Sequence, residues 1–138
     1  MLLRGAIICT ASMASVTSTS VPIEYTISKH AVLGLMKGAA NDLGKYGIRV
    51  NCVSPSVVVT PVAMKFLRDL SGKPSMSEQE VQEFVDSTNV LVGHTFSTLD
   101  VAQAVLYLAS DEAAFVSGHN LLIDGGITIT DRTYQQAK

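Results

Sequence analysis

Short apolar segments that alternate with helical segments constrain the fold of this chain more than any other feature of its sequence. Residues 5–11, 49–53 and 120–124 are short segments that contain apolar runs, which is typical of buried strands. The stretches between them have helical patterns. Strand, helix, strand, helix, strand is the pattern of a parallel α/β sheet. The sequence therefore predicts an α/β fold.

The longest helix is predicted over residues 23–45. Pro22 suits the first helical turn, and Gly47 lies just beyond the predicted end. A helix that is apolar nearly all round is buried on two sides, so we expect one side to lie on the sheet and the other to be covered as well. The apolar residues that cover most of its circumference are Ile27, Ala31, Val32, Leu35, Met36, Ala39, Ala40 and Leu43.

The second half of the chain predicts shorter elements. Residues 54–61 are expected to form a loop at the carboxyl edge of the sheet, followed by amphipathic stretches over 62–70 and 77–88. Ser-Thr-Leu-Asp at 97–100 is a capping box with Asp in place of Glu, which predicts a helix from there to about residue 110. Gly125-Gly126 predicts a turn. The polar segment from residue 131 is expected to be a frayed tail.

Length, charge and cysteine content exclude several classes of function. At 138 residues with a net charge of −2 and a pI near 5.8, the chain is of one-domain size, and nothing indicates a nucleic-acid or membrane partner. No stretch approaches the roughly 18 apolar residues of a membrane span, and the apolar run at 5–11 is too short for a signal peptide. Cys9 and Cys52 read as buried small residues, and no metal-ligand spacing occurs. We expect a cytoplasmic protein without a metal site.

The candidate chemistry lies at Tyr25 and Lys29. Their spacing of four puts both side chains on one face of a helix, where the ammonium favours the phenolate and makes Tyr25 a candidate general acid or base. Ser12 precedes Tyr25 by thirteen residues and follows the first predicted strand, at the edge where open α/β sheets hold their ligands. Such a spacing arises by chance in many helices, so the surrounding segments decide its meaning.

Two further segments complete a pattern: RVNCVSP at 49–55 and GHNLLIDGG at 118–126. With them, the chain resembles the C-terminal half of the short-chain dehydrogenase/reductase family, whose signature is Ser, Tyr-x-x-x-Lys, Asn-x-Val-x-Pro-Gly and a strand ending in Asp-Gly-Gly. It is most similar to the plant branch around secoisolariciresinol and xanthoxin dehydrogenases. The resemblance implies half of a doubly wound, Rossmann-like parallel sheet, in the order strand, helix, strand, helical lid, helix, strand.

The resemblance also implies catalytic roles for Ser12, Tyr25 and Lys29. Tyr25 would donate a proton to the substrate carbonyl oxygen during reduction, or take the alcohol proton during oxidation. Lys29 would promote that transfer and hydrogen-bond the nicotinamide ribose, and Ser12 would hold the substrate oxygen. Ser15 is an alternative to Ser12 if the register of the loop differs, although its spacing of ten to Tyr25 fits the family less well.

For the cofactor, the resemblance implies contacts from Tyr25, Lys29, Pro55, Val58 and Thr60. The backbone amide of Val58 would meet the nicotinamide carboxamide, and the Thr60 hydroxyl would contact nicotinamide or phosphate. A serine stands at position 56, where the family commonly has glycine, so the geometry of this loop stays open. NAD is favoured over NADP only by analogy with the plant branch.

The family's glycine-rich dinucleotide turn and its catalytic Asn have no counterpart in this sequence. We therefore expect residues 1–138 to form one partial domain that lacks the N-terminal dinucleotide-binding half, with a lid insertion at 62–96 and a tail at 127–138.

Two hypotheses on function follow from the sequence. The chain is part of an NAD(P)-dependent oxidoreductase that transfers a hydride between the cofactor and a secondary alcohol or ketone of a hydrophobic, plant-type metabolite. Alternatively, it is a catalytically inactive interaction module. In both cases the 23–45 helix would form a homo-oligomer, and a half sheet with an unpaired edge favours self-association. A Ser-Lys hydrolase is disfavoured, because Thr26 stands three residues before Lys29 and no Gly-x-Ser-x-Gly motif occurs.

Overall fold

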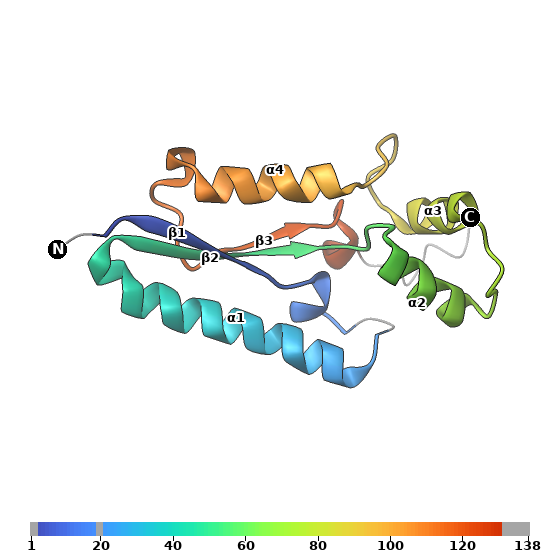
Figure 1. Cartoon of the computed structure of the whole chain (residues 1–138), viewed down its shortest axis with the longest axis horizontal. Helices are drawn as coiled ribbons and strands as arrows, with labels where there is room; N and C mark the ends of the chain where they lie inside the picture. The colour runs from blue at the N-terminus through green and yellow to red at the C-terminus, as the bar shows by residue number, and fades with distance from the viewer. Residues whose placement is uncertain (1–2, 19–20, 131–138) are drawn as a thin grey trace. The chain divides into compact units, whose positions relative to one another are not determined.

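The computed structural model describes residues 3–18 and 21–130, and the tail predicted from residue 131 lies outside them. Short 3-10 turns, labelled η, interrupt the connections. The strands and helices, shown in Figure 1, are β1 (Gly5–Thr10), α1 (Ile23–Leu43), β2 (Ile48–Pro55), α2 (Pro61–Ser71), α3 (Glu78–Thr88), α4 (Thr98–Ala109) and β3 (Asn120–Ile123). The turns are η1 (Met13–Ser15), η2 (Gly44–Tyr46), η3 (Asp111–Ala113) and η4 (Ile127–Ile129).

The chain divides into two compact units. The first consists of Met1–Ser56 and Thr98–Ile123, and the second of Val57–Ser97 and Asp124–Lys138. The second unit contains the segment expected to form a lid, and the assignment of that role stays a prediction.

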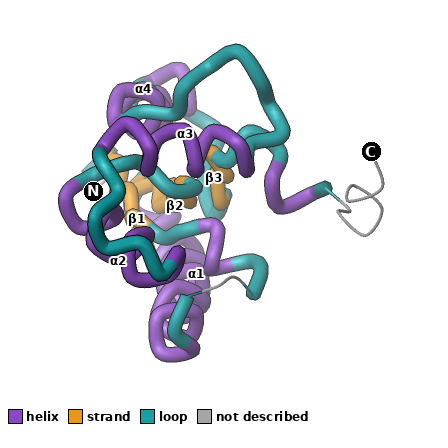
Figure 2. The backbone as a smooth tube through the Cα atoms, turned by 90° about the vertical axis from the view of Figure 1, so that its right-hand side faces the viewer, coloured by secondary structure: helices purple, strands orange, loops and turns teal. Residues whose placement is uncertain are grey.

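The first unit is a parallel sheet with a helix on each face. The strand order is β1-β2-β3, and both pairs are parallel, with Cys9 opposite Cys52 and Cys52 opposite Asn120 in register. Helices α1 and α4 cover opposite faces of this sheet (Figure 1). Figure 2 shows the sheet along its strands, with α1 and α4 on either side. The predicted α/β fold with a parallel sheet is confirmed.

The two largest differences between predicted and observed boundaries lie at the ends of β2 and α1. Strand β2 runs on to Pro55, because Ser54 and Pro55 pair with β3, so the loop predicted from residue 54 begins at Ser56. Helix α1 ends at Leu43 rather than at residue 45, since a 3-10 turn follows it. Gly47, at φ 77°, provides the left-handed conformation that closes this turn.

The core of the first unit lies between α1 and the sheet. Met36, Val50 and Cys52 are fully buried there, and Val32, Leu33 and Ala39 pack around them. The other side of α1 is open in this chain, with Ile23, Ile27 and Leu35 exposed by 69%, 61% and 67%. The expected burial on the sheet side is confirmed. In the described part of this single chain no segment covers the second side, which we expect a second copy of the chain to cover, so its burial stays a prediction.

Polar residues of β2 fix the segment between α4 and β3. The Arg49 guanidinium donates to the carbonyl oxygens of Leu108 at 2.7 Å and Ser110 at 3.0 Å, near the carboxyl end of α4. The Asn51 side chain donates to the Val116 carbonyl at 2.8 Å and accepts from the His119 amide at 3.0 Å. The Arg49 bonds satisfy carbonyl groups that the end of α4 leaves without partners.

The second unit has its own small core. Leu67 of α2 and Val81 and Val85 of α3 are buried against each other, with Met64 and Phe66 packed around them. Helix α3 begins with a capping box that the sequence analysis overlooked. The Glu80 amide donates to the Ser77 hydroxyl oxygen at 3.2 Å, and the Ser77 amide donates to the Glu80 carboxylate at 2.7 Å.

The Asp124 carboxylate organises the predicted glycine turn. It accepts hydrogen bonds from the Gly126 amide at 3.0 Å, the Thr128 amide at 2.9 Å and the Thr128 hydroxyl at 2.6 Å. Gly125 and Gly126 have φ values of 57° and 86°, which glycine adopts without strain. Burial by itself would raise the pKa of Asp124, but the bonds from Thr128 and Gly126 outweigh it and hold the pKa below its ordinary value.

We predict that this carboxylate stabilises the fold only while it is ionised. Because the pKa of Asp124 is lower in the folded state, its contribution is present above the unfolded value of about 3.9 and is lost as the pH falls through the folded value. Asp124→Asn should lower the free energy of unfolding at pH 7 by about 1–3 kcal/mol. Urea titrations should show that the free energies of unfolding of the unmodified chain and the variant differ less below pH 3 than at pH 7. The exposed Asp69→Asn control should leave the free energy of unfolding unchanged at both pH values. A loss of stability in Asp124→Asn that is equal at both pH values would contradict the prediction.

The two thiols should differ in reactivity. Burial, followed by the neighbouring Cys9, raises the pKa of Cys52 to about 11, whereas Cys9 is only half-buried. Since the thiolate is the reactive form, iodoacetamide at pH 7.5 should modify Cys9 and spare Cys52 until urea unfolds the chain. Mass spectrometry of timed samples measures this order. Modification of both thiols at one rate in the folded chain would contradict it.

Candidate active site

The carboxyl end of β1 leads directly into the turn that holds Ser12. The Ala11 amide donates to the Val53 carbonyl at 2.8 Å, which continues the pairing with β2 past the last residue of β1. Ser12 then caps η1, and its Oγ accepts from the Ala14 amide at 3.2 Å. This bond uses one acceptor site of the half-buried Ser12 hydroxyl and leaves its hydrogen free to be donated to a substrate oxygen.

Helix α1 brings Tyr25 and Lys29 together. The Lys29 Nζ lies 5.5 Å from the centroid of the Tyr25 ring and donates to the Thr10 carbonyl oxygen at 3.2 Å. Tyr25 is 41% exposed, so its hydroxyl is open to a ligand. Because the ammonium has three hydrogens, it keeps donors for a second partner. Lys29 thus connects the tyrosine on α1 with the strand that ends two residues before Ser12.

Ser15, the alternative to Ser12, lies in a different environment. It is 1% exposed, and its Oγ is 3.2 Å from the Ser54 Oγ. A buried hydroxyl with a protein partner has no access to a substrate. The geometry therefore favours Ser12 over Ser15 as the serine that meets the substrate.

The residues predicted to contact the nicotinamide fall in both units. Pro55 ends β2 in the first unit, and Val58 and Thr60 belong to the second. Thr60 caps α2, with its Oγ1 accepting from the Ala63 amide at 3.3 Å, so its hydroxyl hydrogen can still be donated. Within residues 3–18 and 21–130, the Val58 amide donates no hydrogen bond.

The donors of the first unit fit the ribose at the nicotinamide end of a dinucleotide cofactor. Tyr25 and Lys29 offer a hydroxyl and an ammonium to such a ribose. The turn after β1 reads Ser-Met-Ala-Ser-Val, without the glycines that let a backbone approach a pyrophosphate. The described residues thus fit part of the cofactor.

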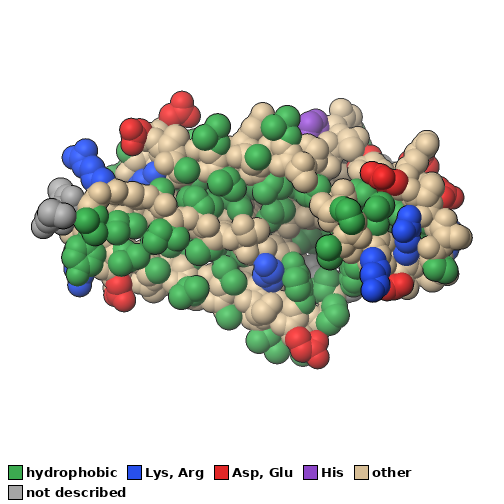
Figure 3. Space-filling model, viewed as in Figure 1, with side chains coloured by type: hydrophobic (Ala, Val, Ile, Leu, Met, Phe, Trp, Pro, Cys, Tyr) green, Lys and Arg blue, Asp and Glu red, His purple; other side chains and the backbone are tan. Residues whose placement is uncertain are grey.

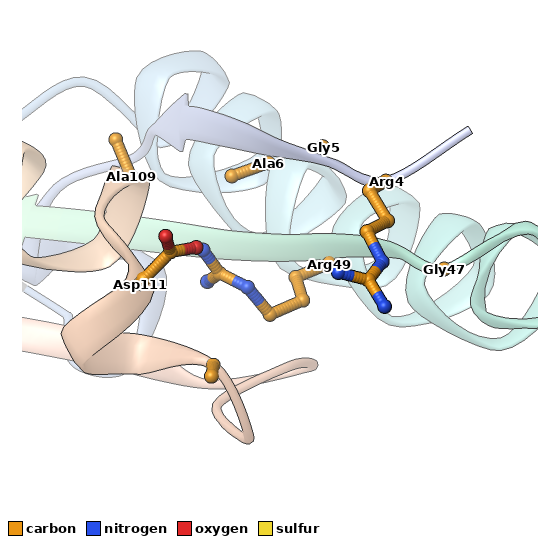
Figure 4. A pocket seen from close by; sticks show the side chains of 8 residues that line it. Arg4, Gly5, Ala6, Gly47, Arg49, Ala109 and Asp111 are labelled. Carbon is orange, nitrogen blue, oxygen red and sulfur yellow. The ribbon is translucent and has the colours of Figure 1, made fainter. Parts of the chain in front are cut away.

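A cavity of about 510 Å³ lies at the other end of the strands. Figure 4 shows Arg4, Arg49 and Asp111 around it, at the starts of β1 and β2 and just after α4. The Arg49 guanidinium already donates to carbonyl oxygens there. Since Ser12 follows the carboxyl end of β1, this cavity is separate from the candidate active site. Its remaining lining residues are Gly5, Ala6, Gly47, Ala109 and Ala114.

In the part of the chain that the structure covers, no three His, Cys, Asp or Glu side chains gather as metal ligands would. None of the helices there has the length and apolar content that crossing a membrane requires.

Sequence reasoning missed two participants in this region. The Thr10 carbonyl, which holds Lys29, is a backbone group and leaves no signal in the sequence. Ser54 was predicted to lie in a loop, yet it is a fully buried residue of β2. Its place directly before Pro55 is the only signal that could have marked it as the end of a strand.

The chain matches the family model described as Enoyl-(Acyl carrier protein) reductase over residues 1–128. It is 46% identical to (+)-borneol dehydrogenase 2 of Salvia officinalis over 132 residues, which is 96% of this chain and 46% of that protein. It is 47% identical to secoisolariciresinol dehydrogenase of Forsythia intermedia over 125 residues, which is 91% of this chain and 43% of that protein. The chain thus spans less than half the length of these relatives.

Solved structures show the same likeness. The aldohexose dehydrogenase of Thermoplasma acidophilum in ligand-free form matches 94% of this chain and 50% of its own, with a TM-score of 0.83 and 31% identity. The carveol dehydrogenase of Mycobacterium avium in complex with NAD matches 93% and 47%, with a TM-score of 0.80 and 30% identity. A parallel α/β sheet, the Ser12, Tyr25 and Lys29 pattern and these matches agree, and the chain belongs to the short-chain dehydrogenase/reductase family.

Proposed function

We propose that this chain carries the catalytic serine, tyrosine and lysine of an NAD-dependent dehydrogenase acting on secondary alcohols. The observation that carries the proposal is the position of Lys29, which contacts the Tyr25 ring and the Thr10 carbonyl just before Ser12. This arrangement puts a cation beside a phenol at the carboxyl end of a parallel strand, where such sheets bind ligands. The whole protein's reaction would then be hydride transfer between nicotinamide and an alcohol or ketone.

Each residue has a distinct part in the proposed reaction. In the oxidising direction, Tyr25 takes the hydroxyl proton of the alcohol, and in the reducing direction it returns a proton to the carbonyl oxygen. The Lys29 ammonium stabilises the phenolate form of Tyr25, which accepts the alcohol proton in oxidation and is left when Tyr25 gives up its proton in reduction. Ser12 holds the substrate oxygen with its free hydroxyl hydrogen. The nicotinamide, when bound, accepts or supplies the hydride.

We propose that Pro55, Val58 and Thr60 meet the nicotinamide. Support comes from the Val58 amide, which donates to no described group, and from the Thr60 hydroxyl hydrogen, which capping leaves free. Solved relatives include one with NAD and one with NADP bound. We propose NAD as the cofactor by analogy with the plant relatives. We also propose that the protein is cytoplasmic.

The proposed substrate is a hydrophobic secondary alcohol or ketone of plant metabolism. Relatives named for borneol, secoisolariciresinol and zerumbone support this class. Among the apolar residues of the expected lid, Met64 and Phe66 pack on the core of the second unit, whereas Phe84 is 40% exposed. Of these three residues, Phe84 therefore has the most surface to offer a substrate.

NADH should bind to the purified 138-residue chain with a saturable change in cofactor fluorescence, which no tryptophan in the chain obscures. Lys29→Ala should weaken the affinity about tenfold or more, because a charge-assisted hydrogen bond is lost. Lys37→Ala is the matched control, an exposed lysine on the same helix, and should leave the affinity unchanged. A folded chain that binds no NADH would contradict the proposed site.

The open side of α1 favours the second candidate function, an interaction module. Ile23, Ile27 and Leu35 expose large apolar side chains along it, and Gly34 and Gly38 leave open space above the helix. Figure 3 shows hydrophobic side chains spread over one face of the molecule. Such a surface is rare on a monomer, so we propose that residues 23–45 form a homo-oligomer. This contact is compatible with either candidate function.

Association through α1 predicts a dissociation constant in the micromolar range or below. Leu35→Glu should weaken it at least about tenfold, since burying a leucine contributes about 1.5–3 kcal/mol and a charge there would be desolvated. Sedimentation velocity over a concentration series measures this change. The Lys37→Glu control, which introduces the same residue on α1, should associate like the unmodified chain. A strictly monomeric chain at micromolar concentration would contradict the prediction.

A further inference from the structure

A buried chain of hydroxyl and amide groups joins the turn η1 to β2 and β3. The Ser15 Oγ lies 3.2 Å from the Ser54 Oγ, which donates to the Asn120 Oδ1 at 2.7 Å. Ser15 and Ser54 are 1% and 0% exposed, so water does not replace either bond. A buried hydroxyl without a partner is costly, and each group in this chain therefore depends on the next.

The direction of this chain follows from counting hydrogens. The Ser54 hydroxyl has one hydrogen and donates it to Asn120, whose Oδ1 only accepts. Ser54 must then accept in its contact with Ser15, so the Ser15 hydroxyl is the donor. The hydrogen bonds run from Ser15 through Ser54 to Asn120, which pairs with Cys52 as the first residue of β3.

The same turn positions Ser12. The Ser15 amide donates to the Ser12 carbonyl at 2.8 Å, and the Ala14 amide donates to the Ser12 Oγ at 3.2 Å. On the other side, Ala11 is held by its amide bond to the Val53 carbonyl at 2.8 Å. The segment from Ala11 to Ser15 is therefore attached to β2 at both ends, and Ser12 lies between the two attachments.

We propose that Ser15 is a positioning residue for Ser12 and acts through Ser54 and Asn120. This inference rests on the proposed function, in which Ser12 holds the substrate oxygen. Ser15 itself touches no substrate. Loss of its hydroxyl would release one attachment of the turn, and a misplacement of about 1 Å at a reacting group can cost on the order of a hundredfold in rate.

Amide hydrogen exchange of the 138-residue chain, followed residue by residue by NMR, tests the proposal without any need for activity. In Ser15→Ala, the amides of Ala14, Ser15 and Val16 should exchange about five- to tenfold faster, as the loss of one net hydrogen bond predicts. Ser54→Ala should give the same local effect. The double variant should be no faster than the Ser54 variant, because Ser54→Ala already removes the bond between Ser15 and Ser54.

The exchange of α1 and β2 amides separates a local effect from a global one. These amides should keep their rates in Ser15→Ala, and the exposed Ser87→Ala control should alter neither group. Unchanged rates at Ala14 and Ser15 in both serine variants would overturn the proposal. A uniform rise over α1 and β2 would overturn it too, since it would assign Ser15 to global stability.

A second arm distinguishes this proposal from the proposed function. Ser15→Ala should bind NADH with the affinity of the unmodified chain, because Lys29 and Tyr25 are untouched. With NAD and (+)-borneol as the probe, kcat should fall about tenfold or more while KM for NAD stays constant. An unmodified chain that binds no NADH would refute the proposed function alone, and the exchange rates would still decide whether Ser15 positions Ser12.

Discussion

The parallel pairing of β1 with β2 is the interaction on which the candidate site depends. It places Cys9 opposite Cys52 and continues through the bond from Ala11 to Val53, so the chain leaves the sheet at a fixed point next to Ser12. The same register presents the Thr10 carbonyl to Lys29. A slip of one residue would turn every side chain of β1 to the other face and separate these groups.

Strand β2 carries most of the connections between the layers. Arg49 binds the carboxyl end of α4, Asn51 binds the connection to β3, and Ser54 binds both η1 and β3. Each of these polar groups is satisfied by a partner far away in the sequence. Buried polar groups of this kind make alternative packings costly, because any other arrangement leaves them without hydrogen bonds.

The likeness to known dehydrogenases and the local geometry support each other at different levels. The family model and the relatives establish the family. The matched segment covers less than half the length of the two plant relatives compared. The geometry shows which polar groups still have hydrogen-bonding capacity for a ligand. Ser12, Lys29 and Thr60 each use part of theirs within the chain and keep donors for a ligand.

The sequence by itself determined the parallel α/β class and the positions of the helices and strands, because apolar periodicity and the residues at the ends of elements are local signals. It also predicted the candidate Ser12, Tyr25 and Lys29 from their spacing and the family resemblance, and left Ser15 open beside Ser12. Only the tertiary structure decided that Ser15 is buried against Ser54, that β2 extends to Pro55 and that the Thr10 carbonyl holds Lys29. These features depend on contacts between residues far apart in the sequence, such as Ser15 with Ser54 and Pro55 with Ile123, and on backbone atoms that are the same in every residue, so no local pattern encodes them.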